Sequence, residues 1–127
     1  MISRIQTSAA PVPMGPFSQG IIAGNLVFVS AQLARDAATG TMKMDSVEEE
    51  TRQVMKNIEA ILAAAGTGFS HVVKASLFLK DMNDYEKVNK VYRSYFSEPY
   101  PARETIQVGA LPLFVNIEIS MIAILST

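Results

Sequence analysis

One arginine and one glutamate in the last quarter of the chain have the residue types of a small polar site. Arg103 follows Pro99-Tyr100-Pro101-Ala102. The two prolines stiffen this approach, because each fixes its own φ and drives the preceding residue toward an extended conformation. Glu118 lies fifteen residues further on, inside the apolar run Val115-Asn116-Ile117-Glu118-Ile119. A rigidly placed guanidinium implies an anion, and a carboxylate among apolar residues needs a partner, so the two residues predict one polar pocket.

Both residues also have a purely structural interpretation. Arginines are mostly solvent-exposed, and a carboxylate in an apolar strand can form an ion pair that aligns an interface without touching a ligand. If the last two strands form a symmetric hairpin, Gln107 lies opposite Glu118, and Arg103 is then roughly 13 Å away along the strands. A long side chain closes that distance only in part. The alternative is that Arg103 of one subunit meets Glu118 of another across a subunit boundary.

Other reactive residues indicate no further catalytic or metal site. Ser30 ends an apolar strand without a nucleophile-elbow sequence, and His71 is the only histidine. The chain has no cysteine, no P-loop and no G-x-G-x-x-G motif. We therefore expect no serine triad, no metal and no cofactor. The lack of cysteine also excludes disulfides and fits a reducing, cytoplasmic compartment.

Composition limits the class of protein. The 127 residues predict a single domain over 1–127, and charged residues make up 18% with a formal net charge of −1. Lysines and arginines are scattered, so we expect no nucleic-acid partner. Apolar runs are far shorter than the roughly 20 residues of a membrane helix, and the N-terminus lacks the apolar stretch of a secretory signal. We expect a soluble protein that does not enter membranes.

The hydrophobic pattern predicts six strands and two helices in the order β-β-β-α-β-α-β-β. After a first strand near the N-terminus, we expect strands at 18–23, 26–31, 71–80, 104–110 and 115–125. Gly24-Asn25 is suited to a tight hairpin turn. Ser46 and Glu49 predict a capping box at the start of the first helix, and Gly66 ends it. Asn83 with Glu86 is expected to cap the second helix, which Pro99 stops.

Two helices can cover only one face of a six-stranded sheet. In the last strand, the odd positions from Val115 to Ala123 form an apolar side that we assign to the helices, and Glu118 faces away from them. Ile122 and Ile124 make the other side apolar too. Leaving such a face in water forfeits about 25 cal/mol per Å². We therefore expect a homo-oligomer that associates sheet face against sheet face.

Several short motifs together resemble the reactive-intermediate deaminase family, RidA/YjgF. They are Gly15-Pro16-Phe17-Ser18-Gln19, Val29-Ser30-Ala31-Gln32, Val88-Asn89, Pro101-Ala102-Arg103, and Leu111-Pro112 through Ile117-Glu118-Ile119. Their order and spacing resemble the family nearly end to end. The resemblance implies a chorismate-mutase-like α/β (α+β) fold, a homotrimer whose sheets form a central barrel, and ligand clefts between subunits.

The resemblance also implies an activity and the residues that carry it. The family hydrolyses 2-imino acids such as 2-iminobutanoate and 2-iminopropanoate to 2-oxo acids and ammonia, without a cofactor. By this match Arg103 would clamp the substrate carboxylate, and Glu118 would orient or deprotonate the attacking water. The positions that match the family's pocket lining are Phe17, Ser30, Ala31, Asn89 and Thr105.

Three positions depart from the family pattern. Phe17 stands where tyrosine is common, which removes a pocket hydroxyl, and Ala31 replaces a glycine. Glu104 replaces a small residue beside Arg103, although strand alternation turns neighbouring side chains to opposite faces. Two other functions compete with the deaminase. One is a trimeric regulatory protein that binds small carboxylates without turnover, and the other is a ribonuclease, which the missing positive groove disfavours.

Overall fold

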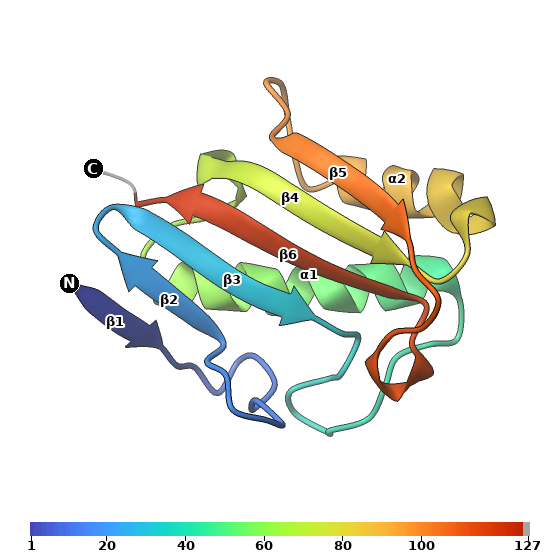
Figure 1. The fold of residues 1–127 in the computed structure, drawn as a ribbon, viewed down its shortest axis with the longest axis horizontal. Coiled ribbons are helices and arrows are strands. Elements are labelled where there is room, and N and C mark those ends of the chain that lie inside the picture. Colours follow the sequence, from blue (N-terminus) through green and yellow to red (C-terminus); the bar gives the residue numbers. More distant parts are fainter. Residues whose placement is uncertain (126–127) are drawn as a thin grey trace.

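The computed structural model describes residues 1–125, which form one mixed six-stranded sheet with two α-helices (Figure 1). The strands are β1 (Ile2–Ile5), β2 (Gly20–Ala23), β3 (Leu26–Gln32), β4 (Val72–Leu79), β5 (Ala102–Gln107) and β6 (Ile117–Ile124), and the helices are α1 (Val47–Ala64) and α2 (Tyr85–Arg93). The predicted α+β class and the order β-β-β-α-β-α-β-β are confirmed.

The sheet order is β1-β2-β3-β6-β4-β5, so β6 lies near the middle and β5 forms one edge. β4 and β5 are parallel, and the other neighbours are antiparallel. The predicted β5–β6 hairpin, with Gln107 opposite Glu118, is wrong: Gln107 pairs with Leu79, and Phe78 lies opposite Glu118. Composition explains the difference, because the polar strand β5 suits a solvated edge whereas β6 is apolar enough for the centre.

The start of α1 follows its sequence closely. The Ser46 hydroxyl accepts a hydrogen bond of 3.1 Å from the Glu49 backbone N–H, which confirms the predicted cap. Only half of the capping box is present, because the Glu49 carboxylate binds the Arg52 guanidinium instead. Gly66 ends the helical segment with φ of +84°, a left-handed conformation that glycine adopts without strain.

The core lies between α1 and one face of the sheet. Five α1 side chains are fully buried there: Val54, Met55, Ile58, Ile61 and Leu62. The side chains of Ile117, Ile119, Met121 and Ala123 on β6 are buried against them, as the odd-position pattern predicts. α2 contacts α1, and its Tyr92 joins the same core, so both helices cover one face.

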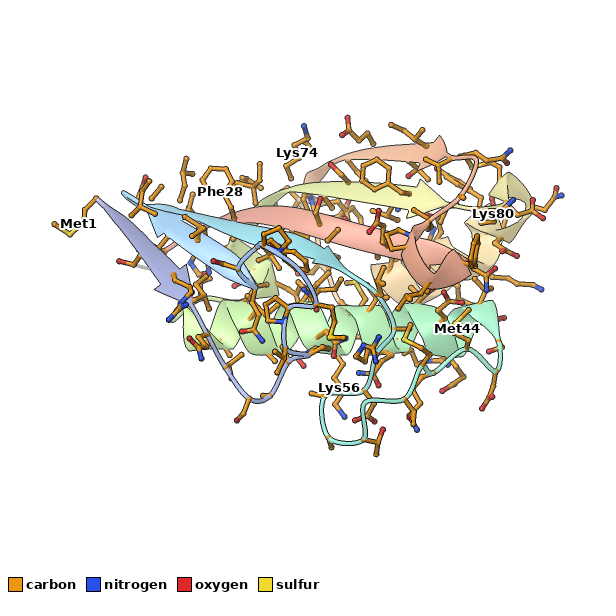
Figure 2. The ribbon with its side chains drawn as sticks, turned by 60° about the horizontal axis from the view of Figure 1, so that its bottom comes forward. Met1, Phe28, Met44, Lys56, Lys74 and Lys80 are labelled. Carbon is orange, nitrogen blue, oxygen red and sulfur yellow. The ribbon has the colours of Figure 1, made fainter. Side chains whose placement is uncertain are left out.

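The opposite face of the sheet has no covering layer within residues 1–125. Figure 2 shows Phe28 and Lys74 standing on this open face, on the side away from α1. The apolar side chains in the paired rows of the open face include Ile2, Ile21, Ala23, Leu26, Phe28, Phe78, Ile106, Ile122 and Ile124. Phe28 and Ile106 are 39% and 45% exposed. The prediction that two helices cover one face is confirmed.

Two local predictions are wrong. Asn83 does not cap α2: the Asp81 carboxylate accepts from the Asn83 N–H, a 3₁₀ turn over Met82–Asp84 follows, and α2 begins at Tyr85. α2 also ends at Arg93, well before Pro99. In β4 the register shifts between Val72 and Lys74. That irregularity leaves the Val73 side chain 44% exposed.

Among residues 1–125, no helix is both long and apolar enough to cross a lipid bilayer.

Candidate functional site: a glutamate cavity and an arginine cluster

Four of the predicted site residues line one cavity of about 540 Å³: Phe17, Ser30, Ala31 and Glu118. The segment from Pro11 to Met14, together with Pro112 and Leu113, supplies most of the remaining wall. We call this the Glu118 cavity. It opens where the loop between β1 and β2 meets the loop before β6, so its lining comes from sequence segments far apart. Its volume is in the range of small-molecule sites in proteins.

Glu118 is the ionisable group of the cavity best placed for proton transfer. It projects from β6 toward the open face and is half-buried. Within residues 1–125 its carboxylate forms no hydrogen bond and no ion pair. Burial disfavours the charged form and raises the pKa of Glu118 above its ordinary value. A half-buried carboxylate with a raised pKa beside a cavity can exchange a proton with a bound molecule.

Ser30 and Ala31 lie where β3 departs from regular pairing with β6. The register shifts between Val29 and Gln32, which places Ser30 and Ala31 in an irregular segment. The Ser30 hydroxyl donates to the Ser18 carbonyl oxygen at 2.6 Å, and the Ser30 N–H donates to the Gln19 carbonyl oxygen at 2.9 Å. These bonds fix Ser30 beside the loop that carries Phe17.

Gln19 is a structural residue of the cavity that sequence reasoning did not single out. It is 3% exposed. Its side-chain oxygen accepts from the Thr7 N–H at 2.8 Å, and its amide nitrogen donates to the carbonyl oxygens of Thr7, Ala10 and Pro11. One side chain thus anchors the loop that forms the cavity wall. The signal available in the sequence was a polar residue directly before an apolar strand.

Glu50 is a second residue that sequence reasoning missed. It lies on α1, is fully buried, and accepts hydrogen bonds from the Asn116 N–H and side-chain amide at 2.8 Å each and from the Ile117 N–H at 3.3 Å. These bonds fix the start of β6, two residues before Glu118. Its sequence signal is a carboxylate between Val47 and Val54, on the stripe that faces the core.

The other predicted residues form a separate group on α2 and β5. The Arg103 guanidinium lies 4.9 Å from the centre of the Tyr92 ring and 5.5 Å from that of Tyr85. Asn89 lies between these tyrosines on the same helix, and Thr105 follows Arg103 on the same face of β5. We call these five residues the Arg103 cluster. Cation–π contacts hold the guanidinium in place without using its hydrogen-bond donors.

The Arg103 cluster contains two polar atoms with unmet hydrogen-bonding capacity. Asn89 Oδ1 and the Tyr92 hydroxyl oxygen are buried, and neither has a hydrogen-bond partner in the part of the chain described. Burial raises the pKa of Tyr92, and the nearby charge of Arg103 opposes that shift. Buried polar groups without partners are costly. Such atoms beside a cation at a sheet edge indicate a surface that another group completes.

The Glu118 cavity and the Arg103 cluster are not brought together within one chain. Arg103 pairs with Ala75, which pairs with Met121 on the helix-covered face, whereas Glu118 points to the open face. The strand and residue spacings separate the Cα atoms of Arg103 and Glu118 by roughly 14 Å. A molecule of a few carbon atoms cannot bridge both groups from opposite faces of a sheet. The prediction of one pocket therefore fails for a single chain, and the alternative across a subunit boundary stays open.

Glu104 does not compete for Arg103. Its carboxylate accepts from the Ser76 hydroxyl at 2.9 Å and lies 3.9 Å from the Lys74 ammonium, on the open face. Alternation along β5 thus separates the two neighbours, as the sequence predicts. Within residues 1–125, no three histidine, aspartate or glutamate side chains converge closely enough to hold a metal ion.

Comparison with known proteins identifies the family. Residues 7–125 match the family described as Endoribonuclease L-PSP. A RutC family protein from Pyrococcus horikoshii is 48% identical, with 94% of each chain covered. A Bos taurus protein named 2-iminobutanoate/2-iminopropanoate deaminase is 43% identical over 94% of this chain and 88% of its own.

Solved structures of similar sequence have the same fold as this chain. RidA from an Antarctic Psychrobacter species superposes with a TM-score of 0.93 at 39% identity, covering 97% of this chain and 99% of its own. Escherichia coli TdcF, crystallised with bound serine, has a TM-score of 0.93 at 36% identity and covers 98% of this chain and 99% of its own. The chain belongs to the Endoribonuclease L-PSP family, the RidA/YjgF family that its motifs resemble.

Proposed function

We propose that this protein is a cofactor-independent 2-iminobutanoate/2-iminopropanoate deaminase, which hydrolyses 2-imino acids to 2-oxo acids and ammonia. The observation that carries the proposal is the unpaired, half-buried Glu118 carboxylate in a cavity of about 540 Å³. The relatives named as deaminases are similar over most of this chain, which supports the same chemistry here. The cytoplasmic location and the single domain over residues 1–127 stay predictions.

The complete site forms between two copies of the chain in a homotrimer. Arg103 from one copy faces the Glu118 cavity of its neighbour, because the two groups lie on opposite faces of their own sheet. The apolar open face supports this assembly, since burying it removes Phe28 and Ile106 from water. A neighbouring copy also offers partners to Asn89 and Tyr92, whose buried polar atoms lack them.

The substrate is held by its carboxylate. Arg103 binds both carboxylate oxygens through two parallel N–H···O bonds, a geometry that the planar guanidinium provides and lysine does not. The tyrosine rings under the guanidinium keep its orientation fixed. Asn89 and Thr105 lie beside Arg103 and add hydrogen bonds to the same end of the substrate. This contact orients the imine carbon toward Glu118.

Glu118 then moves two protons in turn. As a water oxygen attacks the imine carbon, the C=N electron pair moves onto nitrogen, and Glu118 carries one proton from the water to that nitrogen to give a carbinolamine. Glu118 then carries the proton of the new hydroxyl to the amine nitrogen, the C–N bond breaks, and ammonia leaves while the C=O bond forms. The Ala31 backbone and the Ser30 hydroxyl flank this exchange. Phe17 adds apolar surface and no hydroxyl.

A second candidate is a trimeric regulatory protein that binds small carboxylates without turning them over. The bound serine in the related TdcF structure favours it, because serine is a carboxylate but not an imine. The third candidate, a ribonuclease that cleaves phosphodiester bonds, fits the cavity less well than the other two functions. The cavity wall is largely apolar, and its two charged lining residues, Arg35 and Glu118, have opposite signs, so it does not form the positive groove that a nucleic-acid backbone needs.

A coupled assay separates these functions. Threonine dehydratase releases 2-iminobutanoate, and the rate at which 2-oxobutanoate appears is followed at high pH and low buffer concentration, where spontaneous hydrolysis is slow. If the protein is a deaminase, 2-oxobutanoate appears faster as more protein is added, and the Glu118→Gln variant gives no such acceleration. Binding of small carboxylates by calorimetry with no acceleration would favour the regulatory protein and overturn the proposal.

A further inference from the structure

Two exposed aromatic side chains lie beside the two halves of the proposed site. Phe114 follows Leu113, which lines the Glu118 cavity, and Tyr100 lies three residues before Arg103. Building on the proposed function, we infer that Phe114 of one copy packs against Tyr100 of its neighbour and so sets how far Arg103 enters the Glu118 cavity. Phe114 is then a positioning residue of the shared site, and a second copy of this chain is the partner that it binds.

Both rings are exposed to water in the single chain. Phe114 is 85% exposed and Tyr100 is 48% exposed. Among residues 1–125, neither ring contacts another aromatic ring. An aromatic side chain buries roughly 150–250 Å² when it is covered, and a stable interface buries about 800 Å² on each partner. One ring at this position therefore supplies a sizeable share of the area that an interface needs.

The backbone at Phe114 has a conformation that phenylalanine rarely adopts. Leu113 and Phe114 have φ angles of 56° and 55°, in the left-handed region. The Phe114 N–H donates to the Leu111 carbonyl oxygen at 2.9 Å, and the Val115 N–H donates to the Pro112 carbonyl oxygen at 3.4 Å, which closes the turn. Glycine and asparagine suit such a backbone better than a bulky side chain does. A phenylalanine that faces water there costs stability in the single chain, and a partner for its ring offsets that cost.

Tyr100 lies on a rigid approach to Arg103. It stands between Pro99 and Pro101, and each proline fixes its own φ. A tyrosine on a stiff backbone loses little conformational freedom on burial, because only two side-chain torsions become fixed. Aromatic residues are enriched in protein interfaces. Tyr100 therefore has the properties of an interface residue on the β5 side, as Phe114 has on the β6 side.

The residue spacings allow the ring contact and the shared site to form together. Tyr100 precedes Arg103 by three residues, and Phe114 precedes Glu118 by four. By strand rise, each aromatic residue lies roughly 10–13 Å from the functional residue of its own half. Similar offsets let Tyr100 reach Phe114 of the neighbour while Arg103 reaches Glu118. The opposite charges of Arg103 and Glu118 make the two surfaces complementary, and a cyclic trimer repeats the same contact at each boundary.

Within one chain the two rings lie far apart. Gln107 pairs with Leu79, which pairs with Ile117, so the end of β5 lies beside the start of β6. The segment before β5 and the loop before β6 accordingly lie at opposite ends of the sheet (Figure 1). The length of β5 alone separates them by roughly 16 Å. Substitutions that far apart add independently, so energetic coupling between positions 100 and 114 reports a contact between copies.

A double-mutant cycle on the full chain measures this coupling. Analytical ultracentrifugation over a concentration series compares the wild type, Phe114→Asn, Tyr100→Ser and the double variant. Phe114→Asn removes the ring and suits the positive φ, so it should fold normally, whereas its trimers should dissociate at about tenfold or higher protein concentration. The double variant should assemble little worse than either single variant. Val73→Asn is the matched control, since Val73 is 44% exposed and lies in neither half of the site.

Steady-state kinetics test the positioning role. At protein concentrations where Phe114→Asn is still trimeric, KM for 2-iminobutanoate should rise several-fold while kcat stays close to wild type, because Arg103 no longer meets the substrate carboxylate at the right depth. Phe114→Tyr keeps a ring and should restore both assembly and KM. Circular dichroism gives the melting temperature of each variant, which a role in packing within one chain would lower.

The outcomes separate this inference from the proposed function. Additive effects in the cycle, or wild-type assembly and KM in Phe114→Asn, would overturn the inference and leave the deaminase intact. A melting temperature lowered in Phe114→Asn without any change in assembly would assign the ring to its own chain and also overturn it. Strong coupling in a wild-type protein that hydrolyses no imine would support the ring contact and overturn the deaminase. A monomeric wild type would overturn both the ring contact and the shared site.

Discussion

The Glu118 cavity and the Arg103 cluster differ in shape, in polarity and in what each lacks. The cavity is concave and mostly apolar, and its Glu118 carboxylate has no partner among residues 1–125. The cluster lies at a sheet edge and holds its cation against two aromatic rings, and two of its buried polar atoms have no partner within the same described residues. Each half supplies what the other needs: a cation for a carboxylate ligand on one side, and a proton-transfer group on the other.

Under the proposed function, a single chain holds only one part of each site. Both halves are preformed, since Glu50 and Gln19 fix the backbone around the cavity and the tyrosine rings fix Arg103. What separates them is the sheet itself, whose alternation sends Arg103 and Glu118 to opposite faces. In the proposed homotrimer, the Arg103 cluster of one copy meets the Glu118 cavity of the next.

The largest effect is expected when the carboxylate clamp is removed. Arg103→Ala should lower kcat/KM for 2-imino acids by the equivalent of about 2–5 kcal/mol, because a charge-paired contact to the substrate is lost. Arg103→Lys should keep only part of the wild-type kcat/KM, since an ammonium group does not bind both oxygens of the substrate carboxylate in parallel. Arg93→Ala, which removes an exposed arginine at the end of α2, is the control. Steady-state kinetics measure all three, and equal losses in Arg93→Ala would contradict the role of Arg103.

The anchor of the cavity is tested through stability. Glu50→Ala leaves the Asn116 and Ile117 backbone N–H groups buried without an acceptor, and should lower the free energy of unfolding by about 2–4 kcal/mol. Glu50→Gln keeps one acceptor oxygen and should lose less. Glu59→Ala, on the exposed side of α1, serves as the matched variant. Denaturant unfolding followed by circular dichroism gives the values, and a Glu50→Ala protein as stable as Glu59→Ala would refute the anchoring role.

The pKa of Glu118 links the two halves. Burial raises this pKa in the isolated chain, so the folded state keeps the proton to higher pH than the unfolded one. The free energy of unfolding therefore falls as pH rises from the unfolded value of about 4.3 through the raised folded pKa. In the proposed shared site, the Arg103 guanidinium of a neighbouring copy opposes this rise in the pKa of Glu118. Carbon-13 NMR titration should find a higher Glu118 pKa in Arg103→Ala than in the wild type or in Arg93→Ala, and one common value would count against the shared site.

The smallest effect concerns the aromatic support of Arg103. Tyr92→Leu removes the closer ring, and cation–π contacts are worth about 0.5–2 kcal/mol, so KM should rise by a few-fold to about thirtyfold. Tyr92→Phe keeps the ring and should preserve KM. A packing role alone would lower the melting temperature of Tyr92→Leu without raising KM. The comparison of KM with melting temperature across both variants therefore decides between the two roles.

The sequence predicted the positions of the helices and strands better than it predicted which strands pair with one another. The caps and apolar stripes that mark α1 and β6 are local signals, and both elements lie where they indicate. Strand pairing is not local. The hairpin between β5 and β6 failed because β4, which comes earlier in the chain, lies between them. The Asn83 cap failed for a smaller reason, since Asp81 offered a competing acceptor two residues earlier.

Of the predicted site residues, the structure places four around one cavity and sets Arg103, Asn89 and Thr105 apart from them. Phe17, Ser30, Ala31 and Glu118 do share a cavity. Their separation from Arg103 follows from strand order, which periodicity does not reveal. Gln19 and Glu50 were missed because each acts through backbone groups distant in sequence. Such contacts become visible only when the fold places the partners side by side.

Complementation between inactive chains tests the shared site most directly. Arg103→Ala and Glu118→Gln chains, carrying different tags, are co-expressed and the mixed assemblies are isolated. If each site takes Arg103 from one copy and Glu118 from the next, every mixed trimer contains one intact site out of three, and about a third of wild-type activity returns. Mixed assemblies no more active than the two variants alone would contradict a site built from two chains.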